Sequence, residues 1–396
     1  MSVNIGKKTL IIAIAWALVI PVSHAISLDS VMNLPAMGIP VLNYSPESTW
    51  EFGAAAQGYF RLPNQGRTSI VQLDGTYSLR HQWYINAQGN LYFGNNATPR
   101  RTTLHNTPQH AWQLQFRAGY SNRPSTYYGT FNDPHFANEG NTGIGMLRQG
   151  TPYELQRGYL NVQAPIYIGK HFSLGPMTDV LIAEFAIKDV YNTPNPLVQI
   201  GLGAVTQYDT RDNVFYPTRG IFFKASAVAA WTNKMNIPEG QQATINGLLS
   251  ADLRQYIPLP HNIVIAWQFK GQFMLSSNFI SHLTLYPMLP RLGGQDGLRG
   301  INSDMFRDDI MMALQAELRI PIWSIFRATV FAGVGDVYDF HNWHWAIPKV
   351  GYGLGLRAAI NKAKVNIRFD IARSNVDPRW NNINAYSFYL TATEAF

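Results

Sequence analysis

The chain has 396 residues, of which 14% are charged and 13% aromatic, with a net charge of +7 and a mean hydropathy of −0.11. Because soluble proteins usually have about a quarter of their residues charged, this composition favours a membrane protein rich in aromatic side chains. After residue 25 no apolar run approaches the roughly 20 residues of a spanning helix, which excludes a helical membrane protein. The absence of cysteine argues against a disulfide-stapled scaffold, and no basic run indicates nucleic acid.

The N-terminus has the pattern of a signal peptide. Lys7 and Lys8 precede thirteen residues from Leu10 to Val22, which are apolar apart from one proline, and Ser23-His24-Ala25 then offers a small-x-small cleavage site. A membrane anchor is disfavoured because the run is shorter than the roughly 20 residues that a span needs. We predict a signal peptide over residues 1–25, a short lead-in over 26–49 and one barrel domain over 50–396.

From Trp50 onward, apolar and polar residues alternate in segments of about ten residues, which is the length of a tilted transmembrane strand. Turn-forming Gly, Pro and Asn separate the early segments. An unpaired backbone group is costly in lipid, so such a sheet must close on itself. The sequence therefore predicts an all-β, transmembrane antiparallel β-barrel with strands near 50–62, 71–79, 83–93, 112–120, 153–164, 178–188, 221–231, 246–257, 262–276, 310–321, 325–338, 350–360, 363–373 and 384–396.

Two stretches interrupt this alternation with denser motifs. Residues 208–220 read Tyr-Asp-Thr-Arg-Asp-Asn-Val-Phe-Tyr-Pro-Thr-Arg-Gly, where Pro217 and Gly220 favour a turn and the charged residues a wet face. Residues 291–309 contain four glycines and alternating charges, which predict a loop. In the strand that follows, 310–320, the even-numbered residues, such as Leu314, form an apolar face. The odd-numbered residues, which include Glu317 and Arg319, form a polar face.

Both stretches resemble signatures of the BamA/TamA superfamily of outer-membrane β-barrels, the bacterial surface antigen type. Leu298-Arg299-Gly300-Ile301 is similar to the superfamily's Val-Arg-Gly-Tyr/Phe signature, and Gly294, Gly297 and the downstream Glu317-Leu-Arg-Ile-Pro321 strengthen the match. The turn is similar to a second motif, which this chain carries as Asp209, Arg211, Asp212, Pro217 and Gly220. The resemblance implies about 16 strands, an outer loop folded into the lumen, Arg299 docked on Glu317, and a periplasmic turn at 209–220.

The chain departs from the superfamily pattern in three places. The superfamily's second acidic partner lies in a Phe-x-Asp-x-Gly motif, where this chain has Phe331-Ala-Gly333-Val-Gly335, so Arg299 is expected to have one acidic partner. Phe396 resembles the terminal assembly signal of outer-membrane proteins, but Glu394 stands where an aromatic residue is common. POTRA modules usually precede the barrel, and residues 26–49 are too few to form one.

Two groups of side chains are candidate metal ligands. Asp339, His341 and His344 fit no zinc spacing and are interpreted as part of an aromatic barrel rim, and Asp308-Asp309 as solvated loop. No nucleophile, phosphate-binding or zinc-protease motif is present. We therefore expect no metal, no cofactor and no enzymatic activity.

The resemblance implies a function in protein insertion or translocation, through a weak seam between the first and last strands, or in membrane scaffolding. It also implies a separate periplasmic partner, either POTRA-bearing or a chaperone. The alternative is a porin-like diffusion channel for small solutes, with a mild preference for anions. A surface adhesin is disfavoured because the longest loop region, 122–152, is modest. Either leading function places a monomeric barrel in the lipid of the bacterial outer membrane, with no nucleic-acid partner.

Overall fold

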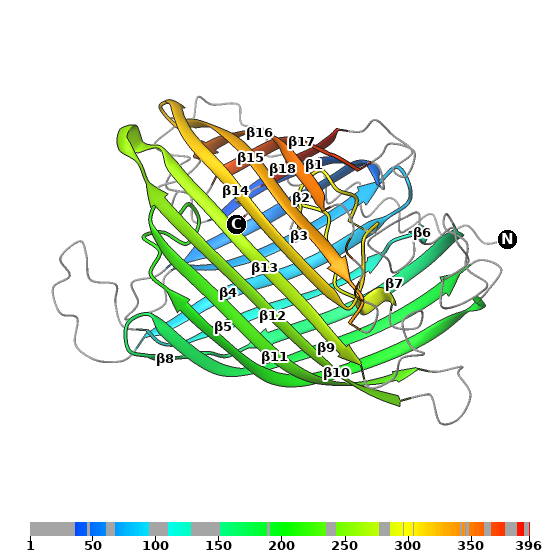
Figure 1. The fold of residues 1–396 in the computed structure, drawn as a ribbon. Helices are drawn as coiled ribbons and strands as arrows, with labels where there is room; N and C mark the ends of the chain where they lie inside the picture. Colours follow the sequence, from blue (N-terminus) through cyan, green and yellow to red (C-terminus); the bar gives the residue numbers. More distant parts are fainter. Residues whose placement is uncertain are drawn as a thin grey trace.

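The computed structural model describes residues 36–45, 48–60, 68–94, 110–127, 151–187, 191–234, 243–276, 286–295, 297–303, 305–340, 343, 345, 348–359, 366–376, 386–391 and 396. Sixteen antiparallel strands form one closed sheet (Figure 1), and two three-residue strands, β6 and β8, prolong β5 and β7. The strands are β1 Ala36–Ser45, β2 Thr49–Phe60, β3 Ser69–Ser78, β4 Trp83–Gly94, β5 His110–Asn122, β6 Ser125–Tyr127, β7 Thr151–Gln163, β8 Ile166–Ile168, β9 Phe172–Ile187, β10 Tyr191–Asp209, β11 Gly220–Lys234, β12 Ala243–Pro258, β13 Val264–Ser276, β14 Ile310–Trp323, β15 Phe326–Tyr338, β16 Lys349–Ala359, β17 Asn366–Ser374 and β18 Ser387–Thr391. Short 3-10 turns lie at Pro260–Asn262 and Tyr286–Met288. No helix in these ranges is long and apolar enough to cross a membrane.

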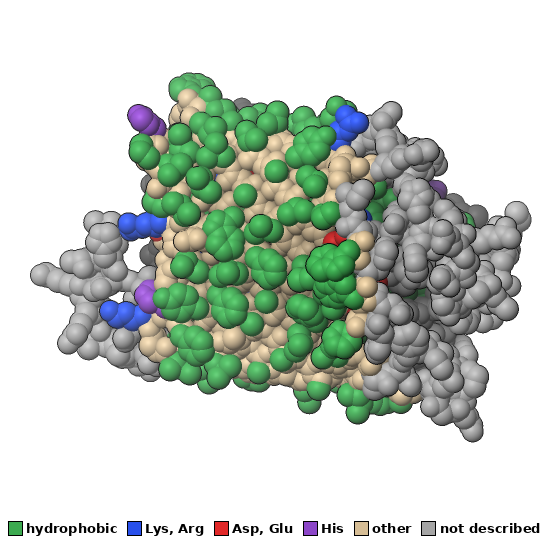
Figure 2. Space-filling model, viewed as in Figure 1, with side chains coloured by type: hydrophobic (Ala, Val, Ile, Leu, Met, Phe, Trp, Pro, Cys, Tyr) green, Lys and Arg blue, Asp and Glu red, His purple; other side chains and the backbone are tan. Residues whose placement is uncertain are grey.

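Side chains alternate between an apolar outer face and a polar interior. On β14, Leu314 is 45% exposed, whereas Gln315 and Glu317 are 5% and 2% exposed. Figure 2 shows the apolar side chains spread over the outer wall. The interior instead carries amides, hydroxyls and charges, including Gln57, Asp74, Asn86, Gln113, Gln199, Thr232, Asn246 and Gln268. This arrangement, inside-out relative to a soluble barrel, is that of a barrel whose outer face meets lipid.

Closure of the sheet depends on β1 and β18. β1 pairs with β2 along its whole length, from Ala36–Gly58 to Ser45–Thr49. Its other edge meets β18 in three residue pairs, Leu42–Leu390, Asn43–Tyr389 and Tyr44–Phe388. We call this β1–β18 junction the seam. Because this pairing is short, few backbone hydrogen bonds join β1 to β18 within the residues that the structure describes.

The prediction of a closed all-β barrel is confirmed, but two strands were missed. β1 lies inside residues 26–49, which were predicted to be a lead-in, so the described barrel begins ahead of residue 50. Pro40 obscured it, although a proline is tolerated on an edge that lacks a full partner. β10 was also absent from the predicted segments, and the last strand ends at Thr391 within the described residues. The predicted signal peptide lies outside those residues.

The connections divide between two ends of the barrel. We call the end where β1 begins and β18 ends the terminal end; the turns at 210–219, 259–263 and 324–325 lie there. The opposite end, the loop end, carries the β13–β14 connection, residues 277–309, and the β15–β16 connection. The motif at 209–220 and the motif around Arg299 therefore enter the lumen from opposite ends.

Candidate functional site

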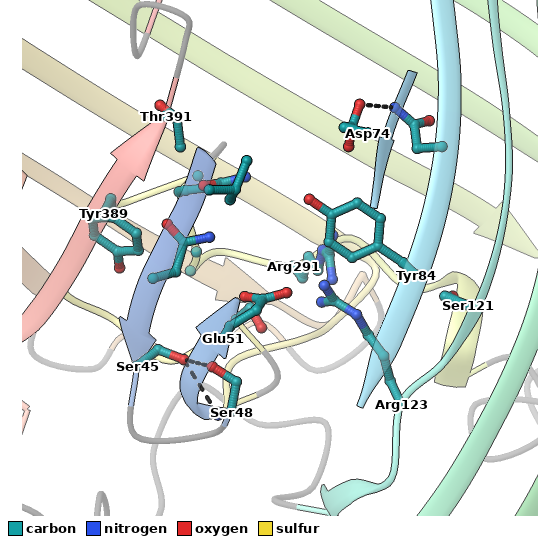
Figure 3. Close-up of a pocket in the computed structure, with 18 of the residues that line it drawn as sticks. Ser45, Ser48, Glu51, Asp74, Tyr84, Ser121, Arg123, Arg291, Tyr389 and Thr391 are labelled. Atoms are coloured by element: carbon teal, nitrogen blue, oxygen red, sulfur yellow. Dashed lines mark hydrogen bonds between the residues drawn. The ribbon is translucent and has the colours of Figure 1, made fainter. Parts of the chain in front are cut away.

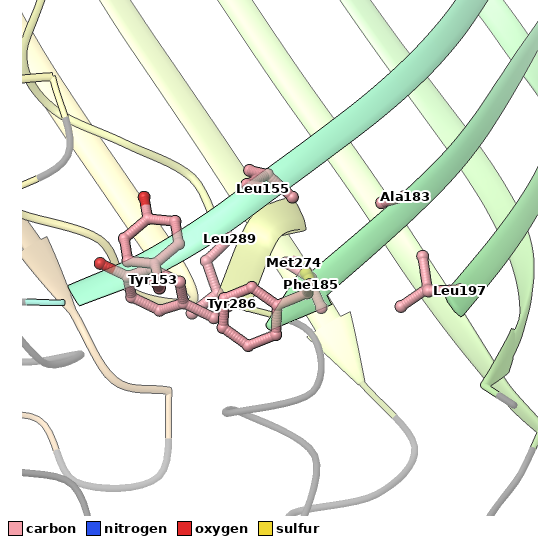
Figure 4. Packing of buried hydrophobic residues seen from close by; sticks show 8 residues of the cluster. All are labelled: Tyr153, Leu155, Ala183, Phe185, Leu197, Met274, Tyr286 and Leu289. Carbon is pink, nitrogen blue, oxygen red and sulfur yellow. The ribbon is translucent and has the colours of Figure 1, made fainter. Parts of the chain in front are cut away.

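The loop between β13 and β14 crosses the lumen; we call its described part, residues 286–309 without 296 and 304, the lumen loop. Its first residues pack on the inner wall (Figure 4). Tyr286 contacts Tyr153 edge to face at 5.7 Å and stacks on Phe185 at 6.2 Å, measured between ring centroids. Leu289 joins the same cluster, which the wall completes with Leu155, Ala183, Leu197 and Met274. This contact fixes one end of the loop on β7, β9, β10 and β13.

The middle of the lumen loop has its own apolar core. Leu292, Leu298, Ile301, Met305 and Phe306 pack on the inward Met311, Ala313 and Val337 of β14 and β15. Gly294 and Gly300 have φ angles of +100° and +89°, which favour glycine because a Cβ is strained there. The Gln315 amide also donates to the Gly297 carbonyl at 2.9 Å. Thus the motif's glycines and apolar residues shape the loop that carries Arg299.

Arg299 docks on two acidic residues of the wall. Its Nη2 lies 3.0 Å from Glu317 Oε2, and its Nη1 lies 2.7 Å from Asp370 Oδ2. The guanidinium carbon is 3.6 Å from the centroid of the Phe331 ring, within cation–π range. Arg299 is 1% exposed and Glu317 is 2% exposed. Because removing one member of a buried pair leaves the other charge uncompensated, removal of either partner should cost about 3–5 kcal/mol.

Three further arginines extend this dock into what we call the arginine network: Arg299, Arg319, Arg357, Arg368, Glu317 and Asp370. Arg319 Nε lies 2.6 Å from Glu317 Oε1, and Arg357 Nη1 lies 2.5 Å from Asp370 Oδ1. Arg368 lies 3.6 Å from Asp370. Four guanidiniums thus share two carboxylates, and carbonyl oxygens accept some of the remaining donors.

The prediction that Arg299 has a single acidic partner is wrong, because Asp370 on β17 supplies the second carboxylate. Gly333, which replaces the superfamily aspartate, has a different role here. A Cβ at this position would lie 2.6 Å from Leu298 Cδ1, so the absent side chain makes room for the loop. Gly351 has the same effect on β16, where a Cβ would lie 2.1 Å from the Arg299 carbonyl oxygen. The second acidic partner thus lies on β17, and the loop backbone approaches β16 where the wall carries glycine.

The turn at 209–220 is held by its own charged residues. Asp209 and Arg211 form a two-point ion pair at 2.9 and 3.1 Å. Asp212 accepts hydrogen bonds from the Thr218 N–H at 2.8 Å and from the Arg219 N–H at 3.3 Å. Gly220 has a φ of +107°, and a Cβ there would clash with the Thr210 carbonyl at 2.5 Å. Acid, arginine and glycine in this motif each have a structural role in the turn.

The same turn reaches the arginine network from the terminal end. Arg319 Nη1 donates to the Pro217 carbonyl at 3.1 Å, and its guanidinium lies 5.0 Å from the Tyr216 ring centroid. Arg319 Nη2 also donates to the Phe396 carbonyl at 3.2 Å. Arg319 also binds Glu317, the carboxylate on which Arg299 docks. The side chains of Arg319 and Glu317 therefore connect the 209–220 turn to the lumen loop.

Phe396 lies in the lumen, 4% exposed, against Tyr256, Val264 and Ala266 of β12 and β13. The sequence predicted an alternating strand to the last residue, which would place this phenylalanine on a strand. Its position at the terminal end adds an aromatic side chain beside Tyr256. Its role as an assembly signal stays a prediction.

The candidate metal ligands Asp308 and Asp309 lie in a buried part of the lumen loop. Asp308 and Asp309 are 1% and 3% exposed, so the interpretation as solvated loop is wrong. Burial raises the pKa of the Asp308 carboxyl well above its usual value, although its hydrogen bond from the Asp309 N–H opposes this rise. No group of three or more His, Cys, Asp or Glu in the described ranges could hold a metal. His341 and His344 lie outside those ranges.

Sequence reasoning missed several members of the site. Asp370, Arg357 and Arg368 were inside predicted strands but were not assigned a role. The sequence did carry a signal for these three residues, because charged residues on an otherwise apolar strand of a barrel must face the lumen. Tyr389 was also missed; its hydroxyl accepts the Gly300 N–H at 3.4 Å, and its residue pairs with Asn43 across the seam. The docked loop therefore touches the strand that closes the barrel.

Comparisons with known proteins agree with the barrel fold. The barrel of BamA from Haemophilus ducreyi lacking POTRA domains 1-3 is similar in fold, with a TM-score of 0.52 at 13% identity over 91% of this chain and 70% of that chain. CdiB from Acinetobacter baumannii gives 0.54 at 10% identity, and CdiB from Escherichia coli gives 0.51 at 13%. The alignments cover 90% of this chain in both cases and 59% and 62% of the CdiB chains. No curated protein matches. The model of the Omp85 superfamily domain matches residues 110–396, and the chain belongs to this superfamily.

Proposed function

We propose that this Omp85-superfamily barrel inserts or translocates other proteins, and that its clients engage the seam. Barrels of this superfamily are generally transport and assembly proteins, and an outer membrane of bacteria or organelles is consistent with this family. The observation that carries the proposal is the short pairing of β1 with β18, which comprises three residue pairs within the described part of these strands. A client strand can pair only with backbone groups that the barrel itself leaves available or releases at low cost.

The neighbouring loop supports this assignment. Gly300 donates to Tyr389 of β18, so the lumen loop rests on the seam strand from inside. The network residues Arg357 and Asp370 lie on β16 and β17, next to that strand along the sheet. The wall beside the seam is thereby fixed from within, while β1 and β18 share few backbone bonds over their described residues. A rigid wall beside a weak junction allows strands to separate without unfolding the barrel.

We also propose a bacterial outer-membrane location, export by the signal peptide of residues 1–25, and a separate periplasmic partner that is POTRA-bearing or a chaperone. The signal-peptide pattern supports export. POTRA domains are named for the similar BamA structure, which supports a partner of that type. The partner would deliver clients to the terminal end.

Site-specific photocrosslinking tests the proposal. A photoreactive residue at Leu42, on the outward face of β1 at the seam, should form adducts with a newly exported barrel protein. The matched control is Leu249 on β12, which is 40% exposed on the outer wall away from the seam and should form none. Equal adducts at both positions would contradict the proposal. Absent adducts, together with a steady conductance in planar bilayers that Arg299→Ala leaves unchanged, would favour the diffusion channel instead.

A further inference from the structure

A cavity of about 530 Å³ opens beside the lumen loop (Figure 3). The loop contributes Arg291 and Ser303, and the facing wall consists of inward residues from β1 to β7 with β12, β13, β17 and β18. Toward the terminal end, the lumen holds the buried Tyr216 and Phe396. A cavity of this volume lies in the range of small-molecule sites, about 300–1,000 Å³.

Positive charge dominates the cavity. Its described lining has seven Lys or Arg residues and two acidic ones, Glu51 and Asp74. Glu51 accepts a hydrogen bond from Thr76, and Asp74 accepts hydrogen bonds from Gln72 at 2.8 Å and Asn86 at 3.0 Å. Two of the basic residues pair with acids just outside the lining, Arg254 with Asp252 and Arg368 with Asp370. The other five, Arg117, Arg123, Arg157, Lys270 and Arg291, still outnumber the two acidic residues of the lining. The surplus of basic residues favours an anionic occupant.

Three of the arginines are held in position by aromatic rings. Arg117 and Arg157 lie 5.7 and 5.9 Å from the Tyr159 ring centroid, and Arg123 lies 5.6 Å from that of Tyr84. Tyr159 is itself fixed by a 2.9 Å hydrogen bond from its hydroxyl to Asn86. Figure 3 shows the Arg123 and Arg291 side chains near each other in the cavity. Guanidiniums fixed in this way lose little conformational entropy when they bind a phosphate.

The rest of the lining is rich in amides and hydroxyls, such as Gln88, Asn43 and Ser121. These groups bind hydroxyls, whereas arginines bind phosphate through paired N–H groups. We propose that this cavity is a binding site for a phosphate-bearing saccharide, either a free sugar phosphate or the headgroup of a phosphorylated glycolipid. Asn43 of β1 and Tyr389 of β18 also line the cavity, but the three arginines lie on β5, on β7 and directly after β5, so the proposal does not rest on client insertion at the seam.

Calorimetry on the purified full chain in detergent tests the free-solute source. Glucose 6-phosphate should bind saturably, glucose should not, and added salt should weaken binding. The Arg117→Gln/Arg157→Gln double variant should weaken binding by at least about tenfold, because two charged donors are lost. Arg80→Gln, in the exposed β3–β4 turn outside the lining, is the matched control and should leave the affinity unchanged. Glu51→Gln should tighten binding, a gain that a misfolded barrel would not show.

Native mass spectrometry with lipid A tests the headgroup source. Lipid A retained by the wild type and by Arg80→Gln, but lost from the double variant, supports a glycolipid. Thermal unfolding of each variant checks that the barrel is intact. The proposal is overturned if neither probe binds, if glucose binds as well as its phosphate, or if the double variant keeps the wild-type affinity. Crosslinking at the seam would be unaffected by any of these results.

Discussion

The seam and the opposite wall are built from the same kind of strand but are bonded very differently. β11 and β12 pair from Gly220–Tyr256 to Asn233–Ala243, whereas β1 and β18 pair only from Leu42–Leu390 to Tyr44–Phe388 in the described residues. β18 itself is five residues long, against sixteen for β12. The contrast shows that, over the described residues, neighbouring strands of this closed barrel are joined along very unequal lengths.

Contacts of the lumen loop inside the barrel partly compensate for the short pairing at the seam. The lumen loop packs its apolar start on β7, β9, β10 and β13 and docks Arg299 on the wall next to the seam. These buried ion pairs thus lie close to the short β1–β18 junction. Under the proposed function, the loop would keep β14 to β17 in place while a client engages the seam.

A disulfide across the seam should have the largest effect. The Leu42→Cys/Leu390→Cys pair joins register partners of β1 and β18, and Ala227→Cys/Leu249→Cys joins partners of β11 and β12 as the control. If clients engage the seam, oxidation should abolish client assembly in the first variant and leave it intact in the second. A radiolabelled client and its folding-dependent gel shift give the measurement, and reductant should restore activity. Full activity of the oxidised seam variant would contradict the proposed mechanism.

Arg299→Ala should destabilise the barrel by about 3–5 kcal/mol, because Glu317 and Asp370 lose a buried partner. Unfolding of the refolded protein in denaturant measures the change. Arg80→Ala removes an exposed arginine at the loop end and should change the free energy of unfolding by less than about 0.5 kcal/mol. Equal effects of both substitutions would mean that the dock contributes little.

Gly351→Ala should displace the loop from the wall at a cost of about 1–3 kcal/mol, since the added Cβ meets the Arg299 carbonyl at 2.1 Å. Gly58→Ala on β2 is the control, because its Cβ would find no atom nearer than 4.0 Å. The two unfolding midpoints, compared under the same conditions, measure the difference. A midpoint for Gly351→Ala no lower than that of the control would show that loop and wall do not touch closely.

The smallest effect should be a pH dependence from Asp308. Burial raises the pKa of this carboxyl in the folded chain, so stability is highest where it is protonated and falls as pH rises through the raised pKa. Asp308→Asn should therefore stabilise the barrel at pH 8 but not at pH 3. Thermal midpoints at the two pH values measure this. A variant less stable than the wild type at pH 8 would show that the charged form is favoured, for instance by a cation.

Local patterns were enough to predict the barrel and the two motifs. Alternation with period two identified fourteen of the strands, because inward and outward side chains of one strand meet different solvents. It failed for β1, where Pro40 masked the pattern, and for β10. Glycines and charges marked the loop and the turn because those residues are favoured at special φ angles and in wet surroundings.

The sequence by itself determined the alternating strands, the closed barrel and the candidate pair Arg299 and Glu317. Only the tertiary structure decided that Asp370, 71 positions further along the chain than Arg299, supplies the second carboxylate. It alone showed that Gly333 makes room for Leu298, and that Arg319 links the loop to the 209–220 turn. The physical reason is that strand faces follow from local periodicity, whereas contacts across a lumen depend on the register and tilt of all the strands together.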